Sequence, residues 1–184
     1  MTPRAAAPDP LAYYSPEMHL FPALAQSFAE TGQLHPEALY LILDWKGPRA
    51  KHLRRLTRIA RTFNTAARRI GADLHGAAGP EQRLGVLLTR WDFSLSTASA
   101  ILAVLYPDTF TMYDIRVCNA LGDFGRLGNK KWSAEMWQEY QRYVAAVRSK
   151  APPGLSLREC DRWLWGRDKR EAMRAELASI KAPA

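Results

Sequence analysis

A carboxylate and a helix of small residues form the part of the chain whose residue types could do chemistry. The segment 96–102 is rich in serine and alanine, and Asp114 follows Ser96 by eighteen positions. Small side chains on a helix permit close approach by another backbone or by a ligand. We expect Asp114 at the N-terminus of a helix over 115–121, where the helix dipole favours an ionised carboxylate. A plain helix N-cap is the alternative interpretation of the same residue.

A connection between two predicted helices precedes this pair. The residues Arg90-Trp91-Asp92-Phe93-Ser94 separate a helix over 81–89 from a helix over 95–106. Asp tolerates the left-handed backbone region, and Ser is a favoured N-cap, so a tight hairpin can form here without glycine. We therefore expect the helix of small residues to start directly after a hairpin.

The stretch 83–121 resembles the helix-hairpin-helix DNA glycosylase superfamily, most closely its adenine mismatch branch. The matching residues are Ser96-Thr97-Ala98-x-Ala100-Ile101-Leu102, then Phe110, then Asp114-x-x-Val117, ending at Leu121. In that family the hairpin holds a DNA phosphate, and the aspartate at the position of Asp114 is the catalytic carboxylate. Bifunctional members carry a Schiff-base lysine at the position that matches Ser96. Serine there implies a monofunctional enzyme without lyase activity.

The chemistry of base release agrees with what the resemblance implies. Cleaving a nucleobase from deoxyribose passes through an oxocarbenium-like transition state, which a carboxylate such as Asp114 can stabilise while it orients water. The base must first rotate out of the stack into a pocket lined by aromatic or apolar groups. The candidates for that pocket are Tyr13, Tyr14, Trp45 and Tyr113, each of which could equally be an ordinary core or surface aromatic residue.

Two departures from the family pattern bear on function. The family hairpin reads Gly-x-Gly, because glycine lets the backbone turn with positive φ and bring its N–H groups against a phosphate. This chain has Asp92-Phe93-Ser94 instead, and an acid that faces a phosphate is unfavourable. The four cysteines of the iron–sulfur cluster found in many members are also absent.

The net charge of the chain is concentrated in one short segment. Between Asp44 and Arg69 there are nine basic residues against the single acid Asp44, which equals the whole net charge of +8. Apolar residues recur there at spacings of three and four, so we expect one helix, ending near Gly71, with a basic outer face. Such a face attracts polyanions through counterion release, although a solvated face without a partner has the same pattern. The predicted DNA contacts are Lys46, Arg49, Lys51, Arg54, Arg55, Arg58, Arg90, Ser94, Ser96 and Thr97.

The remaining pattern predicts an all-α protein with a helix-hairpin-helix, glycosylase-like fold. We expect a disordered lead-in over residues 1–12 and a single helical domain over 13–181. The expected helices run from Ser15 to Gly32, from His35 to Gly47, and over 81–89, 95–106 and 115–121. Further helices are expected over 132–148, 156–165 and 168–180.

Cysteine, histidine and hydropathy patterns narrow the class of protein. Cys118 and Cys160 cannot form a four-cysteine metal site, and the histidines lack metal-ligand spacing, so we expect neither a metal nor another cofactor. We expect both cysteines to be reduced, buried thiols. No apolar run reaches the ~20 residues of a membrane-spanning helix, and no secretory signal is visible. We expect a cytoplasmic, nucleoid-associated protein without a membrane partner.

Three functions follow in order of preference. The first is a monofunctional DNA glycosylase in base excision repair that removes a damaged, mispaired or modified base with Asp114 as its carboxylate. The second is a catalytically inactive relative that binds DNA in repair or defence. The third is a protein-interaction module with an incidental basic face. The sequence leaves open the excised base, the oligomeric state and the roles of the segments 45–49 and 157–165.

Overall fold

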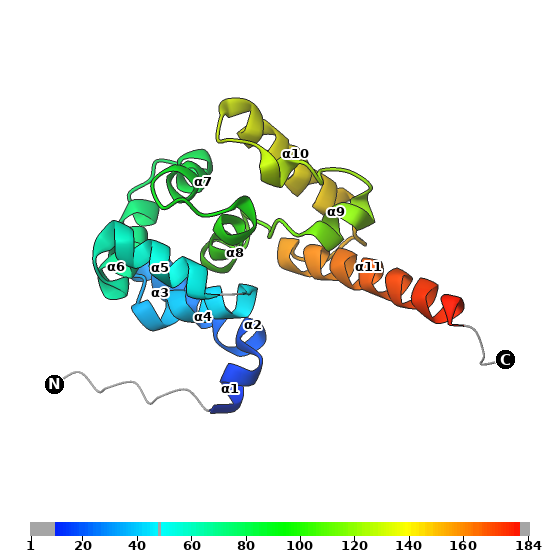
Figure 1. Ribbon diagram of the computed structural model, residues 1–184, viewed down its shortest axis with the longest axis horizontal. Helices are drawn as coiled ribbons and strands as arrows, with labels where there is room; N and C mark the ends of the chain where they lie inside the picture. The colour runs from blue at the N-terminus through cyan, green and yellow to red at the C-terminus, as the bar shows by residue number, and fades with distance from the viewer. Residues whose placement is uncertain (1–9, 48, 181–184) are drawn as a thin grey trace. The chain divides into compact units, whose positions relative to one another are not determined.

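The chain is helical and divides into two compact units. A computed structural model describes residues 10–47 and 49–180, and over these residues helices are the regular elements and no strand occurs (Figure 1). Unit 1 ends at Gly76 and unit 2 begins at Ala77. The expected all-α class is therefore confirmed. The single domain expected over 13–181 stays a prediction, and each unit is described by itself below.

Unit 1 contains six described helices. They are α1 (Pro10–Tyr14), α2 (Pro16–His19), α3 (Phe21–Thr31), α4 (Pro36–Lys46), α5 (Arg49–Ala60) and α6 (Phe63–His75). The expected lead-in differs in part, because α1 already begins at Pro10, and residues 1–9 lie outside the described residues. The core of the unit includes these fully buried apolar side chains from α3 to α6: Phe28, Leu39, Ile42, Leu56, Ile70 and Leu74.

The helix expected from Ser15 to Gly32 is two helices, with Leu20 at the junction. Pro22 explains the break, because it has no N–H with which to continue a helix from α2, whereas the second position of a new helix needs none. Gly32 ends α3 in the left-handed conformation at φ 65°. A Cβ at Gly32 would lie 2.6 Å from the His75 ring, so the close packing of α3 on α6 requires glycine there.

The single basic helix that we expected to reach Gly71 is also two helices, α5 and α6. Arg61 adopts φ 66°, and Thr62 then caps α6 by accepting a hydrogen bond from the Thr65 N–H at 3.1 Å. The bend lets both helices bury apolar residues in the unit 1 core, Leu56 and Ala60 from α5 and Ala67 and Ile70 from α6. The local cause is Thr62, because its hydroxyl accepts the hydrogen bond of a backbone N–H that would otherwise need a carbonyl partner from a continuous helix.

Unit 2 contains α7 (Pro80–Thr89), α8 (Leu95–Leu105), α9 (Ile115–Leu121), the short 3₁₀ helix η1 (Leu127–Asn129), α10 (Ala134–Lys150) and α11 (Leu157–Ser179). The predicted α7, α8 and α9 are confirmed to within a residue at each end. Helix α8 is buried along its whole length apart from half-buried Ser96, which explains its small and aliphatic residues.

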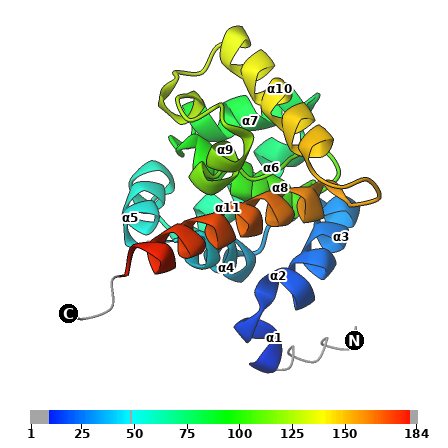
Figure 2. The same cartoon turned by 90° about the vertical axis from the view of Figure 1, so that its right-hand side faces the viewer.

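The two helices expected over 156–165 and 168–180 are one continuous helix, α11. A capping box starts it, because the Ser156 side chain accepts from the Glu159 N–H while the Glu159 carboxylate accepts from the Ser156 N–H. Gly166 lies inside the helix without interrupting it. Helix α9 packs beside the first half of α11, as Figures 1 and 2 show.

Candidate functional site

Asp114 is the N-cap of α9, as the sequence predicts. Its Oδ1 accepts a hydrogen bond from the Arg116 N–H at 3.0 Å, and its carbonyl accepts from the Cys118 N–H. Asp114 is half-buried, and the residue that follows it, Ile115, is 59% exposed. The carboxylate thus lies near the surface of unit 2 at the positive end of a helix.

A hydrogen-bonded chain joins the residue before Asp114 to the helix of small residues. The Ser99 hydroxyl on α8 accepts from the Tyr113 N–H at 2.8 Å and donates to the Ser96 carbonyl at 3.3 Å. Ser99 is fully buried. Ser96 and Tyr113, the residue before Asp114, are therefore connected through one buried hydroxyl.

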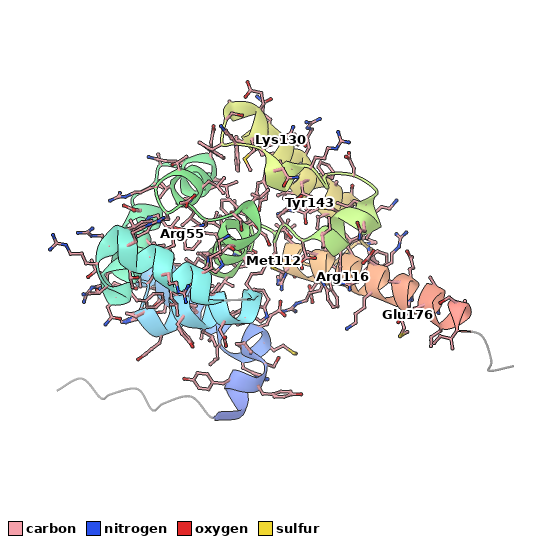
Figure 3. The ribbon with its side chains drawn as sticks, viewed as in Figure 1. Arg55, Met112, Arg116, Lys130, Tyr143 and Glu176 are labelled. Atoms are coloured by element: carbon pink, nitrogen blue, oxygen red, sulfur yellow. The ribbon has the colours of Figure 1, made fainter. Side chains whose placement is uncertain are left out.

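The residues just before Tyr113 are held by buried polar side chains of α10 and α11. The Tyr140 hydroxyl donates to the Thr111 carbonyl at 2.6 Å. The Tyr143 hydroxyl donates to the carbonyl of Met112 at 2.8 Å, and both of these residues are labelled in Figure 3. Burial raises the pKa of both tyrosine hydroxyls above the ordinary value, so both remain donors at neutral pH. The segment 111–113 is therefore fixed although it belongs to no helix.

Asp161 on α11 is the buried carboxylate of this network. Only 2% exposed, it accepts from the Thr111 hydroxyl at 2.8 Å and from the Met112 N–H at 3.5 Å. The Arg158 guanidinium donates to both of its oxygens. A buried carboxylate needs such a partner, because the desolvation of an unpaired charge is costly. The segment 157–165, to which the sequence alone gave no role, thus anchors the approach to Asp114.

Arg116 extends from α9 to α11 and stays partly exposed. Its guanidinium forms an ion pair with Asp168 at 3.0 Å and lies 5.4 Å from the centroid of the Trp165 ring. The Lys169 ammonium lies 5.1 Å from the same centroid. These contacts tie α9 to α11 near Asp114.

Tyr113 is 7% exposed and serves as an anchor for the loop that follows α9. Its hydroxyl donates toward the Phe124 carbonyl at 2.9 Å and accepts from the Gly128 N–H at 3.0 Å. A Cβ at Gly128 would lie 2.8 Å from the Tyr113 ring. Burial raises the pKa of neighbouring Cys118 to about 11, so its thiol is protonated at neutral pH. The side chain expected in a base pocket is thus committed to the loop.

The connection before α8 has the left-handed residue and the N-cap that the sequence predicts. Asp92 is exposed and adopts φ 53°, in the left-handed region. Ser94 caps α8, since its hydroxyl accepts from the Thr97 N–H at 3.4 Å. Arg90 is exposed, whereas Thr97 is buried with its hydroxyl 3.1 Å from that of Ser94. Of these expected DNA contacts, Thr97 therefore stabilises the helix start from inside.

The described lysines and arginines of unit 1 lie on α4, α5 and α6, except Arg61, which lies in the bend between α5 and α6. Lys51, Arg54 and Arg58 are exposed, and Lys46 and Arg55 are half-buried; the side chain of Arg49 lies outside the described residues. Arg61, Arg68 and Arg69 are also exposed. The apolar face expected beneath them is largely confirmed, except that Ile59 is 37% exposed.

The remaining pocket candidates belong to unit 1. Tyr13 and Tyr14 on α1 are 55% and 93% exposed, and Trp45 meets the Phe21 ring edge to face at a centroid distance of 5.1 Å. None of these three comes from unit 2, which carries Asp114 and Tyr113.

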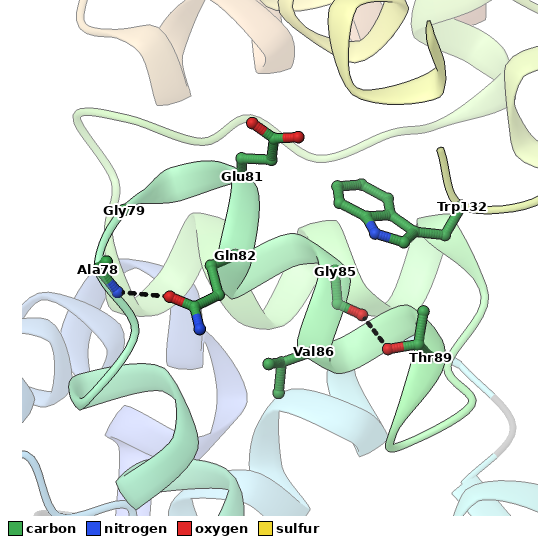
Figure 4. Close-up of a pocket in the computed structure, with 8 residues that line it drawn as sticks. All are labelled: Ala78, Gly79, Glu81, Gln82, Gly85, Val86, Thr89 and Trp132. Carbon is green, nitrogen blue, oxygen red and sulfur yellow. Dashed lines mark hydrogen bonds between the residues drawn. The ribbon is translucent and has the colours of Figure 1, made fainter. Parts of the chain in front are cut away.

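A shallow cavity of about 610 Å³ in unit 2 has Trp132 as one wall (Figure 4). The indole stands over Gly85 on α7, where a Cβ would lie 2.8 Å from the ring. Gln82 accepts from the Ala78 N–H at 2.7 Å, and the Thr89 hydroxyl donates to the Gly85 carbonyl at 2.8 Å. Asp114 does not line this cavity, so the two features are separate.

The sequence predicts Asp114 at the start of α9, as the structure has it, but it gave no role to Ser99, Asp161, Tyr140 and Tyr143. One signal was available for Asp161. It falls at the same spacing as the buried residues Leu157, Cys160 and Leu164, so an acid occupies the apolar face of a helix. A charged residue at such a position indicates a buried partner.

Some features are not found within the described residues. No group of histidines, cysteines and acids there could hold a metal ion, and no described helix is long and apolar enough to cross a bilayer. Cys118 and Cys160 are both free and buried, which agrees with the sequence prediction. Compared with models of protein families, with curated proteins and with solved structures, the chain has no significant match in any of the three.

Proposed function

We propose that this protein is a monofunctional DNA glycosylase with a helix-hairpin-helix site, and that Asp114 is its catalytic carboxylate. The observation that carries the proposal is the chain from the Ser96 carbonyl through the Ser99 hydroxyl to the Tyr113 N–H. It links the helix after the hairpin to the residue before the carboxylate. Such a link is what a site needs if it is to hold an acid against a sugar.

The proposed reaction is hydrolysis of an N-glycosidic bond. The bond between C1′ and the base nitrogen breaks, the base leaves with the electron pair, and the developing charge on the sugar is stabilised by the carboxylate. A water molecule then adds to C1′, its proton is lost, and an abasic site remains. Ser96 lacks an amine, so no Schiff base and no strand cleavage follow.

DNA would be held by contacts in both units. Exposed Lys51, Arg54 and Arg58 on α5 supply charge that is independent of base sequence. Exposed Arg90 and half-buried Ser96 flank the turn at the start of α8. The proposal includes a base rotated out of the stack, since an acid at a helix end cannot reach C1′ inside a duplex.

The test uses duplex oligonucleotides that carry a panel of lesions, mismatches and modified bases. Abasic sites are detected as strand breaks after alkali treatment. The wild-type chain should produce them on at least one duplex, and Asp114→Asn should lower the rate by about 100- to 1000-fold while leaving DNA affinity unchanged. Asp108→Asn is a matched control, because Asp108 is an exposed acid of the same unit. Equal rates for the wild type and Asp114→Asn would refute the assignment.

A second candidate is a DNA-binding protein without catalytic activity. The exposed acid Asp92 at the tip of the hairpin favours it, because a phosphate meets repulsion there rather than the N–H groups of a glycine turn. This candidate predicts salt-sensitive DNA binding with no base release across the whole panel. Absence of DNA binding would instead favour a protein-interaction module.

A further inference from the structure

The segment 111–113 is held more tightly than a connection between helices requires. Each of its three residues has a backbone group bonded to a buried side chain: Thr111 to Tyr140, Met112 to Tyr143 and Asp161, and Tyr113 to Ser99. These side chains come from α8, α10 and α11. Three helices therefore converge on the residues that lead directly into Asp114.

We propose that Ser99 is a positioning residue that fixes the direction of the Asp114 carboxylate. The inference rests on the proposed function, in which that carboxylate faces a sugar. The cap on Arg116 N fixes Asp114 relative to α9 only. The bond from the Tyr113 N–H to Ser99 fixes the start of α9 relative to α8, and it lies one residue from the carboxylate.

Packing alone does not explain a serine at this position. Its neighbours Ala98, Ala100 and Ile101 are fully buried, and alanine would fill the same place in the helix. Burying a hydroxyl is unfavourable unless it is hydrogen-bonded. The Ser99 hydroxyl is bonded on both sides, to the Ser96 carbonyl and the Tyr113 N–H. The hydroxyl thus fixes the direction of the segment 111–113, and the packing of α8 does not require it.

The test compares the full-length wild type with Ser99→Ala. Amide hydrogen exchange should show slow exchange for Tyr113 in the wild type and an acceleration of roughly 10-fold or more in the variant. The ¹³C signal of the Asp114 carboxyl carbon should shift or broaden. Ser149→Ala is the matched control, because it removes the same kind of hydroxyl-to-carbonyl bond from an exposed site on α10. It should change neither signal.

Enzyme kinetics separate positioning from general structural support. On a substrate that the wild type cleaves, Ser99→Ala should lower the single-turnover rate by about 10- to 100-fold without changing the Kd for substrate DNA. Equal loss of rate and of affinity would overturn the inference, and so would unchanged Tyr113 exchange. If the wild type releases no base, the proposed function fails. The Tyr113 and Asp114 signals of the variant then decide about the positioning role by themselves.

Discussion

The two units use their polar residues in opposite ways. In unit 1 the bases of α5 and α6 are mostly exposed, and the residues beneath them are apolar. In unit 2 the polar residues around 111–114 are mostly buried, and each contacts a named partner. Exposed charge contributes to binding at little cost to the fold, whereas a buried network fixes geometry and is costly to damage. In the proposed function, the exposed charge of unit 1 would attract DNA, and the buried network of unit 2 would fix the geometry around Asp114.

The largest effect is expected from breaking the buried ion pair of unit 2. Asp161→Ala removes a carboxylate that binds the Arg158 guanidinium through both oxygens, and it removes the acceptor of the Thr111 hydroxyl. The free energy of unfolding should fall by about 3 kcal/mol or more, measured by urea denaturation of the full chain. Asp168→Ala, at the more exposed ion pair with Arg116, should cost less than half as much. A loss below about 1 kcal/mol for Asp161→Ala would contradict the central role of this network.

Charge reversal in unit 1 should affect DNA binding and leave stability almost unchanged. The triple change Lys51→Glu, Arg54→Glu and Arg58→Glu should weaken DNA binding and reduce the slope of log K against log salt concentration by about three. The free energy of unfolding should change by less than about 1 kcal/mol, because all three residues are exposed.

A control for that variant reverses three exposed bases of unit 2, Arg142, Lys150 and Arg174. If net charge alone governs binding, this control weakens it as much as the triple change on α5. If binding is local to α5, the control retains most of the affinity and of the salt slope.

A Cβ added against Tyr113, which anchors the loop after α9, should have a moderate effect on the free energy of unfolding. In Gly128→Ala the new Cβ lies 2.8 Å from the Tyr113 ring, so the ring or the loop must move. We expect a loss of about 1–3 kcal/mol in the free energy of unfolding. Gly125→Ala, in the same loop, meets no atom within 4 Å and should be nearly neutral. Equal losses of stability in the two variants would show that the loop moves away from the new Cβ at no energetic cost.

The smallest effect is expected at the bend between the two basic helices. Thr62→Ala removes the side-chain cap of α6 and should lower the free energy of unfolding by about 1 kcal/mol. Thr57→Ala serves as a control, since its hydroxyl only donates to carbonyls within α5. An unchanged stability for Thr62→Ala would mean that burial, and not the cap, sets the bend.

Helix positions in unit 2 were predictable where a local signal ends or begins a helix. Ser94 and Asp114 are N-caps at the expected places, and the helix expected from residue 156 begins at Leu157 with Ser156 as its N-cap. The failures have local causes as well. Apolar periodicity predicts one continuous helix through Pro22 and another through Thr62, but in each place the structure has two helices. The reverse holds at Gly166, which lies between two expected helices but does not interrupt α11. Periodicity reports a shared buried face, and two helices joined by a bend can share that face.

The composition and order of residues determined the all-α class, the concentration of positive charge before Arg69, and the aspartate at a helix start. These depend on neighbours within a few positions, which a sequence displays directly. Only the tertiary structure decided that Ser99 bonds to Tyr113, that Asp161 bonds to Thr111, and that Tyr113 anchors a loop. Such bonds join residues up to fifty positions apart, and they form because the folded core brings those groups together and excludes the water that would otherwise satisfy them.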